Sequence, residues 1–389
     1  MFFKNDPVSI DCVKTYDEDL IYAVLKERMC LLCPGFSELD GKMVMIKPNL
    51  VRKMKPEEAA TTHPSILIPL VKLLREQGAE VIIAESPAGV YSEATLKNIY
   101  RVCEIDKAAQ WGAQLNFDTT SGSLSAPKGE STKVFNVITP VLKADLMINL
   151  CVLKSHGLTT MSAACKNLFG LIPGVQKIEM HARFTEQIPF CNMILDLDEA
   201  VSDHVPMFCI CDAIIGMEGN GPTGGTPREI GYILTSKNPA TLDLAAEHIL
   251  GMDNRVEMLQ EARRRGFCPE RFDALSLVGE HHPEPVSDFV MPESKTSMLT
   301  FALTFGGGRF KRLFEPKPMI DKKKCIGCGE CQRSCPKGTI VMKPKQGGGR
   351  IAKIEDKNCI KCYCCQELCP HGGVKIHKNF IMKIVDGIH

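Results

Sequence analysis

Residues 144–157 read ADLMINLCVLKSHG, an apolar run that ends in a cation, a hydroxyl and an imidazole. A short apolar run bounded by polar residues indicates a strand that is buried on both faces. Similar runs occupy 42–49, 79–86 and 206–215, and a further strand is expected at 228–236. Segments with apolar residues at helical spacing alternate with them, at 64–79, 94–113, 183–203 and 238–250. This alternation predicts an α/β fold with a mostly parallel sheet flanked by helices.

Four of the expected strands end in polar residues. These ends are Lys47-Pro48-Asn49, Glu85-Ser86, Lys154-Ser155-His156-Gly157 and the glycine-rich segment that begins at Gly216. In open parallel sheets, ligands bind beyond the carboxyl ends of the strands. If the four strands are parallel, their polar ends meet at one rim of the sheet and form a candidate ligand site.

Three of the polar ends also allow a simpler interpretation. Lys47 could be a surface lysine, Glu85 could cap the next helix, and 216–229 could be a long ordered connection. Residues 154–157 point more strongly to a site, because they combine three kinds of polar group before an expected helix start, where an anion can bind.

Residues beyond the strand ends complete the predicted site. Lys166 and Asn167 could support it, or could only end a helix before Gly170. The segment 216–229 lacks the GK[ST] of a phosphate-binding loop, and it precedes a strand rather than a helix. We predict catalytic roles for His156, Lys154 and Glu85, and cofactor-binding roles for Lys47, Asn49, Lys166, Asn167, Glu218 and Gly221.

Three other features each allow two interpretations. His63 precedes a helix and could be a cap or a ligand, and Asp243 could reach the rim or bind a backbone group. Cys30 and Cys33 form a CxxC pair in an apolar context, which favours buried thiols over a redox pair.

Cysteine is unusually frequent, with 19 residues in a chain of 389. In a large chain without a recognisable signal peptide, metal ligation explains such a number better than disulfides do. Nine of the 19 lie between Cys325 and Cys369. Most of the others, such as Cys103, Cys165 and Cys191, lie in apolar surroundings, where a thiol usually behaves as a small buried hydrophobe.

The clustered cysteines form two copies of C-x2-C-x2-C-x3-C-P, the pattern of bacterial two-cluster ferredoxins. In that pattern the fourth cysteine of each motif ligates the other cluster. We therefore predict two [4Fe-4S] clusters, one held by Cys325, Cys328, Cys331 and Cys369 and the other by Cys359, Cys362, Cys365 and Cys335. A zinc site fits less well, because zinc motifs prefer two separated cysteine pairs around one ion.

Cys364 is left over at the position where the first motif has Glu330. We expect it to ligate nothing, and exchange with a neighbouring ligand is the alternative. Residues 338–358 alternate around a glycine-rich turn and predict a β-hairpin, and 374–385 could supply a closing strand. Together these features predict an α+β, ferredoxin-like two-cluster domain at 319–380, after an α/β domain at 1–310.

The bulk composition is that of an ordinary soluble protein, with 44% hydrophobic and 24% charged residues. The net charge of +1 gives no global attraction to nucleic acid or to an acidic membrane. No apolar run approaches the roughly 18 residues that cross a bilayer, so we expect a cytoplasmic protein. The oligomeric state is left open.

The segments KPNL, ESPAG, LKSHG, KNLFG, MEGNGPTGGTPRE and NPATLD resemble the family known as domain of unknown function 362. The resemblance covers roughly residues 40 to 310. It implies an α/β fold, and members often carry an appended two-cluster ferredoxin module. It implies no substrate, because no general function is known for the family.

The first functional hypothesis is an iron–sulfur oxidoreductase, in which low-potential clusters deliver electrons to an anionic substrate or cofactor at the sheet rim. Low-potential clusters suit difficult reductions in anaerobes. The alternative is a non-catalytic electron carrier or adapter that docks a redox partner, and a metal or cluster carrier is a third possibility. No flavin or nicotinamide fingerprint stands out, so a flavin or other organic cofactor is left open.

Overall fold

A mixed sheet of nine strands forms the centre of the large domain in the computed structural model, which describes residues 6–280, 282–292, 317–345 and 348–377. The strand order is β11-β1-β10-β9-β7-β2-β3-β4, with β8 paired to β7. The strands are β1 (Val8–Cys12), β2 (Met43–Lys47), β3 (Glu80–Ile83), β4 (Gln114–Leu115), β7 (Leu146–His156), β8 (Thr160–Ser162), β9 (Met207–Glu218), β10 (Thr226–Ser236) and β11 (Leu277–Gly279). A separate hairpin joins β5 (Ser121–Ser125) to β6 (Val134–Ile138).

The strands with the predicted polar ends are parallel neighbours. β2 pairs with β3 on one side and with β7 on the other, and β7 pairs with β9. The carboxyl ends of these four strands therefore meet at one rim, as expected from the sequence. β10 runs antiparallel to β9, so residues 219–225 form a hairpin link at the same rim.

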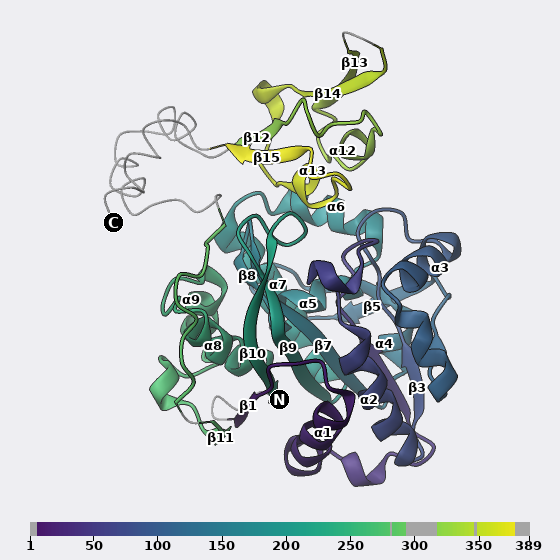
Figure 1. Ribbon diagram of the computed structural model, residues 1–389, viewed down its shortest axis with the longest axis vertical. Helices are drawn as coiled ribbons and strands as arrows, with labels where there is room; N and C mark the ends of the chain where they lie inside the picture. The colour runs from purple at the N-terminus through teal and green to yellow at the C-terminus, as the bar shows by residue number, and fades with distance from the viewer. Residues whose placement is uncertain (1–5, 281, 293–316, 346–347, 378–389) are drawn as a thin grey trace.

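Helices cover both faces of the sheet (Figure 1). One core includes side chains of α1 (Glu18–Leu32), α2 (Pro64–Glu76) and α3 (Glu93–Val102). The other includes side chains of α4 (Thr139–Lys143), α5 (Ala164–Asn167), α7 (Gln187–His204), α8 (Pro239–Ile249) and α9 (Glu257–Arg264). Along β2, Val44 and Ile46 belong to the first core and Met45 to the second, which explains why the strand is apolar up to Lys47.

Two helix predictions need correction. The segment 94–113 is not one helix: α3 ends at Val102, Glu104 adopts a left-handed φ of 58°, and a 3-10 helix follows at Ile105–Trp111. A left-handed residue cannot continue a right-handed helix. The expected helix at 183–203 begins at Gln187, and it is preceded by α6 (Gly174–Arg183), which the sequence analysis did not predict.

The C-terminal module lies beyond the rim of the sheet (Figure 1). β12 (Lys317–Ile320) pairs with β15 (Val374–His377), and β13 (Ile340–Pro344) pairs with β14 (Arg350–Ile354) as the expected hairpin. Two short helices, α12 (Glu330–Arg333) and α13 (Cys364–Glu367), follow the cysteine loops. The rest of the expected closing strand, 378–385, and the predicted boundary at 310 lie outside the described residues. Within the described ranges, no helix is long and apolar enough to cross a membrane.

Candidate functional site

The eight motif cysteines line two separate cavities in the C-terminal module. Cys325, Cys328, Cys331 and Cys369 line the first, of about 320 Å³, and Cys335, Cys359, Cys362 and Cys365 line the second, also of about 320 Å³. These are the two sets that the motif spacing assigns, including the exchange of the fourth cysteine. Four converging thiols are the donor set of a [4Fe-4S] cluster, so each cavity fits one. A bound cluster would supply one-electron transfer.

The two cysteine loops share one backbone geometry. Gly327 and Gly329 have left-handed φ values of 77° and 80°, and the equivalent Lys361 and Tyr363 have 54° and 59°. These tight turns direct three thiols of each loop towards one cavity. Backbone amides also donate to sulfur, from Gly373 to Cys369 Sγ at 3.1 Å and from Thr339 to Cys335 Sγ at 3.3 Å. Such bonds favour thiolates and tune the reduction potential of a bound cluster.

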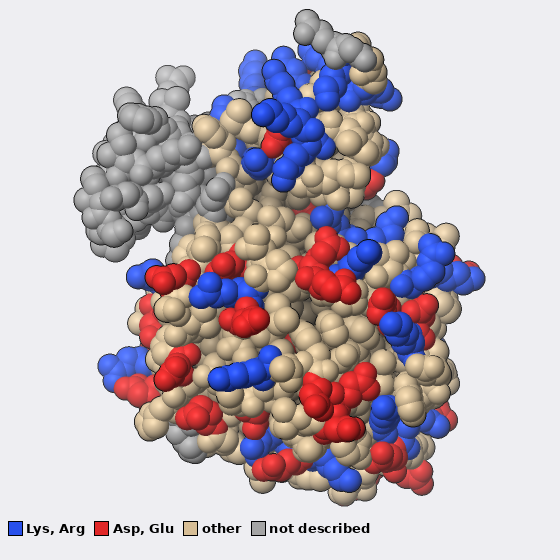
Figure 2. Space-filling view, viewed as in Figure 1, with Lys and Arg blue, Asp and Glu red and all other residues tan. Residues whose placement is uncertain are grey.

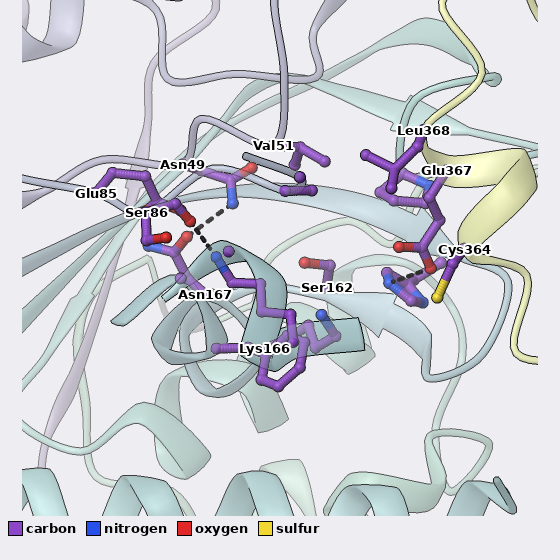
Figure 3. A pocket seen from close by; sticks show the side chains of 18 of the residues that line it. Asn49, Val51, Glu85, Ser86, Ser162, Lys166, Asn167, Cys364, Glu367 and Leu368 are labelled. Carbon is purple, nitrogen blue, oxygen red and sulfur yellow. Dashed lines mark hydrogen bonds and ion pairs between the residues drawn. The ribbon is translucent and has the colours of Figure 1, made fainter. Parts of the chain in front are cut away.

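Cys364 lines neither of these cavities. It begins α13, is buried, and lines a third and larger cavity together with Glu367 and Leu368 (Figure 3). The residue predicted to be spare therefore lies between the second cluster cavity and the large domain.

This third space, the interdomain cavity, lies between the sheet rim and α13 and comprises about 670 Å³ of space between atoms, part of it open to solvent. Two contacts hold α13 against the rim: Gln366 Nε2 donates to the Asn220 carbonyl at 2.9 Å, and Thr223 Oγ1 donates to the Glu367 carbonyl at 2.7 Å. Figure 3 shows Asn49, Glu85 and Asn167 on one side of the cavity, and Cys364, Glu367 and Leu368 on the other. Residues from both domains therefore share one site.

A buried polar network joins three of the strand ends. Lys47 Nζ pairs with Glu85 Oε2 and donates to Asn167 Oδ1 at 3.2 Å. Asn167 Oδ1 also accepts from Asn49 Nδ2 at 2.7 Å, and Asn49 Oδ1 accepts from Lys154 Nζ. Burial lowers the pKa of Lys47, while Glu85 opposes this shift. Five of the predicted site residues thus form one hydrogen-bonded unit.

Close packing surrounds this unit. A Cβ on Gly170 would collide with the Glu85 carboxylate and the Lys47 ammonium, so any larger residue there would have to displace this ion pair. Asp243 accepts hydrogen bonds from the backbone N–H groups of Ala164 at 2.7 Å and Cys165 at 3.1 Å. Asp243 thus binds backbone groups, the second of its two sequence interpretations, and fixes the start of α5. That short helix carries Lys166 and Asn167 to the cavity.

Lys166 is half-buried and lines the interdomain cavity. Its ammonium lies 4.7 Å from the ring centre of Phe169 and 5.8 Å from that of Phe190. Among the described residues, no hydrogen-bond acceptor contacts Lys166 Nζ. Burial lowers its pKa, and Glu367 opposes the shift. This cation is therefore available to an anionic ligand, whereas Lys47 and Lys154 are already bound to protein oxygens.

His156 lines the cavity, and its hydrogen bonds determine which ring nitrogen carries the hydrogen. Its Nδ1 accepts hydrogen bonds from the backbone N–H groups of Leu158 at 3.1 Å and Thr159 at 3.2 Å. Burial lowers the pKa of His156, so the ring is neutral and carries its hydrogen on Nε2. Nε2 lies 3.3 Å from Glu367 Oε1, within ion-pair distance but without the alignment of a hydrogen bond.

Two cavity residues on α6 were missed by the sequence analysis. Lys177 and His181 both line the cavity and lie four residues apart, on one face of the helix. Lys177 Nζ donates to the carbonyls of Ser86 and Pro87. His181 stacks on Phe190 with ring centres 4.7 Å apart, and its Nδ1 has no hydrogen-bond partner in the ranges that the structure describes. Burial lowers the pKa of His181 to about 3, so this ring is neutral as well.

Lys177 gives a testable pH dependence. Burial lowers its pKa from 10.5 to about 7, so between about pH 7 and 10 the unfolded chain binds a proton that the folded chain does not. This difference makes the contribution of Lys177 to stability rise with pH across that window. We expect Lys177→Met to lack this contribution, so the wild-type advantage in unfolding free energy should grow from pH 7 to 9.5 in anaerobic urea titrations. Parallel pH profiles for the two proteins would contradict this assignment.

Two predicted binding residues lie apart from the cavity lining. Glu218 Oε2 accepts from the Val290 N–H at 3.1 Å, and Oε1 lies 3.9 Å from Arg228. Gly221 donates its N–H to Ser155 Oγ at 3.2 Å, and a Cβ there would collide with Ser155. Pro222, the next residue, does line the cavity. The segment 219–225 thus positions α13 through Asn220 and Thr223 rather than surrounding a ligand.

The remaining candidates lie elsewhere. His63 is the N-cap of α2, where its Nδ1 accepts from the Ser65 N–H at 3.2 Å, in agreement with the cap interpretation. Cys33 is buried but Cys30 is exposed, so the expectation of two buried thiols is wrong for Cys30, which lies on the solvent side of α1. Cys103, Cys165 and Cys191 are buried as expected.

Known protein families match both domains of the chain. The family model described as domain of unknown function (DUF362) matches residues 44–248, and a 4Fe-4S dicluster domain model matches residues 324–373. The thylakoid-associated protein sll1697 of Synechocystis is 29% identical over 255 residues, which cover 65% of this chain and 77% of that protein.

Two solved structures are also similar. The lactate racemase apoprotein of Thermoanaerobacterium thermosaccharolyticum matches with a TM-score of 0.41 and 14% identity over 64% of this chain. A structural-genomics protein from Thermotoga maritima matches with a TM-score of 0.37 and 12% identity over 63% of this chain. The match spans 58% and 59% of the lengths of those two chains.

Proposed function

The chain belongs to the DUF362 family and carries a 4Fe-4S dicluster domain, and from this premise we propose that it is an iron–sulfur oxidoreductase acting on a small anionic molecule. Electrons would pass from the C-terminal module to a substrate or cofactor held in the interdomain cavity. The observation that carries the proposal is the shared lining of that cavity. Lys154, His156 and Lys166 come from the large domain, while Cys364 and Glu367 come from α13, the helix that also carries the predicted cluster ligand Cys365.

The charges of the cavity favour an anion. Lys154, Lys166 and Lys177 all line it, and burial lowers the pKa of each. An anionic ligand would stabilise their protonated forms, so binding would be accompanied by proton uptake. Lys166 is the group best placed to contact the ligand, since its ammonium lies over the aromatic rings of Phe169 and Phe190 and meets no hydrogen-bond acceptor within the described part of the chain. The neutral imidazoles of His156 and His181 add donors without further charge.

A reduction also consumes protons. Glu85 and His156 are the two candidates for proton donor that the sequence suggested. The Glu85 carboxylate is paired with Lys47 and packed against Gly170, which leaves it a structural role in our proposal. His156 is neutral, so its Nε2–H can hydrogen-bond a ligand at the cavity wall but does not give up its proton. We therefore assign the proton-donating role to Glu367, which lines the cavity and whose pKa is raised by burial.

Substitution of Lys166 tests the proposed binding site. In thermal-shift titrations with inorganic phosphate and with acetate, we expect at least one anion to stabilise the wild-type protein saturably. Lys166→Met should weaken that binding about tenfold or more, because the ligand loses a charge-assisted contact. The control Lys97→Met removes an exposed lysine of α3 and should leave the affinity unchanged.

Iron content and visible absorbance should be the same in all three proteins, because neither lysine contacts a cluster cavity. Equal affinities in wild type and Lys166→Met, or no stabilisation of the wild-type protein by either anion, would contradict the proposal. A non-catalytic electron carrier, the alternative function, predicts this second outcome.

A further inference from the structure

The two cluster cavities differ in their exposure to solvent. In the first, Cys328 is exposed, and the side chain of Ile326 beside it is 64% exposed. Each cavity has two buried cysteines, but the second has no exposed one among its four: Cys335 and Cys359 are half-buried, and helix α13, which carries Cys365, packs against the large domain. The first cavity is therefore the outer one and the second the inner one.

Basic residues adjoin the cysteine loop of the outer cavity. Lys322, Lys323 and Lys324 directly precede Cys325 and are all exposed. Lys345 Nζ donates to the Lys322 carbonyl at 3.3 Å, and the backbone of Arg350 packs against Gly327 in the first cysteine loop. We call Lys322, Lys323, Lys324, Lys345 and Arg350 the basic face.

This concentration of charge is local. Over the whole chain Lys and Arg number 47 and Asp and Glu 46, whereas between 317 and 377 the basic residues outnumber the acidic ones more than two to one. Figure 2 shows blue side chains gathered on the module, while blue and red are mixed over the large domain. Two of the module's acidic residues form ion pairs with residues outside the basic face, Asp321 with Lys375 and Glu330 with Arg333, which leaves the net excess of basic residues unchanged.

We propose that the basic face, with Ile326 and Cys328 near its centre, is the docking surface for a small acidic electron-carrier protein. Charge complementarity would steer the carrier towards the outer cavity, and the apolar Ile326 would pack against it once docked. The carrier would give one electron to the outer cluster, and a proton need not move in that step. This inference rests on electron transfer through the module, but it does not depend on which molecule the interdomain cavity binds.

The exposed cluster ligand Cys328 within the basic face favours a protein partner over an anionic membrane. A lipid headgroup would use the charges but would have no use for a redox centre at the surface. The arrangement also gives the two cavities separate tasks: electrons enter at the outer one, on the basic face, and leave from the inner one, next to the interdomain cavity.

Binding of an oxidised, acidic plant-type [2Fe-2S] ferredoxin tests this proposal without any substrate. We expect the cluster-loaded wild-type protein to bind it by isothermal titration calorimetry, with an affinity that falls as salt is added. The double variant Lys322→Glu/Lys324→Glu should bind at least about tenfold more weakly at low salt. Carbodiimide cross-links mapped by mass spectrometry should join ferredoxin carboxylates to the lysines of the basic face.

The matched control is Lys14→Glu/Lys26→Glu, which reverses two exposed lysines at or near α1, at the opposite end of the molecule (Figure 1). It has the same net charge change and should bind ferredoxin within about twofold of wild type. An equal loss in both double variants would show only a net-charge effect and would overturn the proposal. It would also be overturned if phosphatidylserine vesicles, and not ferredoxin, lost binding in Lys322→Glu/Lys324→Glu.

Discussion

Replacing Cys362 by alanine should remove one of two clusters and leave the other in place. Cys362 lines only the inner cavity, while Cys325, Cys328, Cys331 and Cys369 remain to hold the outer cluster. We therefore expect iron to fall from about eight to about four atoms per chain, with a proportional loss of visible absorbance. Iron and sulfide analysis of anaerobically reconstituted protein measures this directly.

Cys364→Ala is the matched control, because it removes a thiol two residues away on the same loop. Cys364 faces the interdomain cavity and lines neither cluster cavity, so this variant should keep both clusters. Equal iron loss in Cys362→Ala and Cys364→Ala would mean that Cys364 is a ligand, and the assignment of the inner cluster would then be wrong.

The largest effect on stability should come from Lys47→Met. The substitution would leave the Glu85 carboxylate, only 4% exposed, without its cation in the interior. Removing one partner of a buried ion pair costs about 3–5 kcal/mol. Anaerobic denaturant titration should show this loss as a large shift in midpoint.

Lys42→Met is the control, because Lys42 directly precedes β2 and Lys47 ends it. Lys42 is 53% exposed and lies 3.9 Å from Asp145, a surface pair of the kind that contributes about 0–1 kcal/mol. The double variant Lys47→Met/Glu85→Gln should recover part of the loss, because no unpaired charge is then buried. Equal destabilisation by Lys47→Met and Lys42→Met would show that the pair at the rim is not an energetic element of the fold.

The sequence predicted the sheet and its rim because buried parallel strands have a strong local signal. Met43–Lys47 and Leu146–His156 are largely buried and mostly apolar, and each ends in polar residues at the same rim, although β7 extends beyond β2 because Lys47 lies opposite Asn149. Residues such as Lys47, Asn49 and Lys154 could be found in this way without knowledge of their partners. The cysteine spacing is also a local signal. It predicted the two cavity linings because three cysteines of each cavity come from one short loop and the fourth follows the known exchange between motifs.

The missed residues depend on long-range packing. Glu367 reaches the site because α13 docks on residues 219–225, more than a hundred residues earlier in the chain, and no local pattern encodes that contact. The α6 residues Lys177 and His181 had only their four-residue spacing as a signal, in a segment with few apolar residues. Glu218 was expected at the site because it ends a strand, but its side chain turns to the Val290 backbone instead.

The central claim is that electrons from the clusters reach a small molecule in the interdomain cavity. The most direct test is to reduce the two-cluster protein, remove the reductant, and mix it rapidly with the protein-free small-molecule fraction of an anaerobic cell extract. Recovery of cluster absorbance reports electron loss, and ferricyanide serves as a control oxidant that needs no binding site. We predict that the extract reoxidises wild-type protein at least about tenfold faster than Lys166→Met, while ferricyanide oxidises both at the same rate. Equal rates with the extract would show that electrons leave by a route that bypasses the cavity, and would contradict the account.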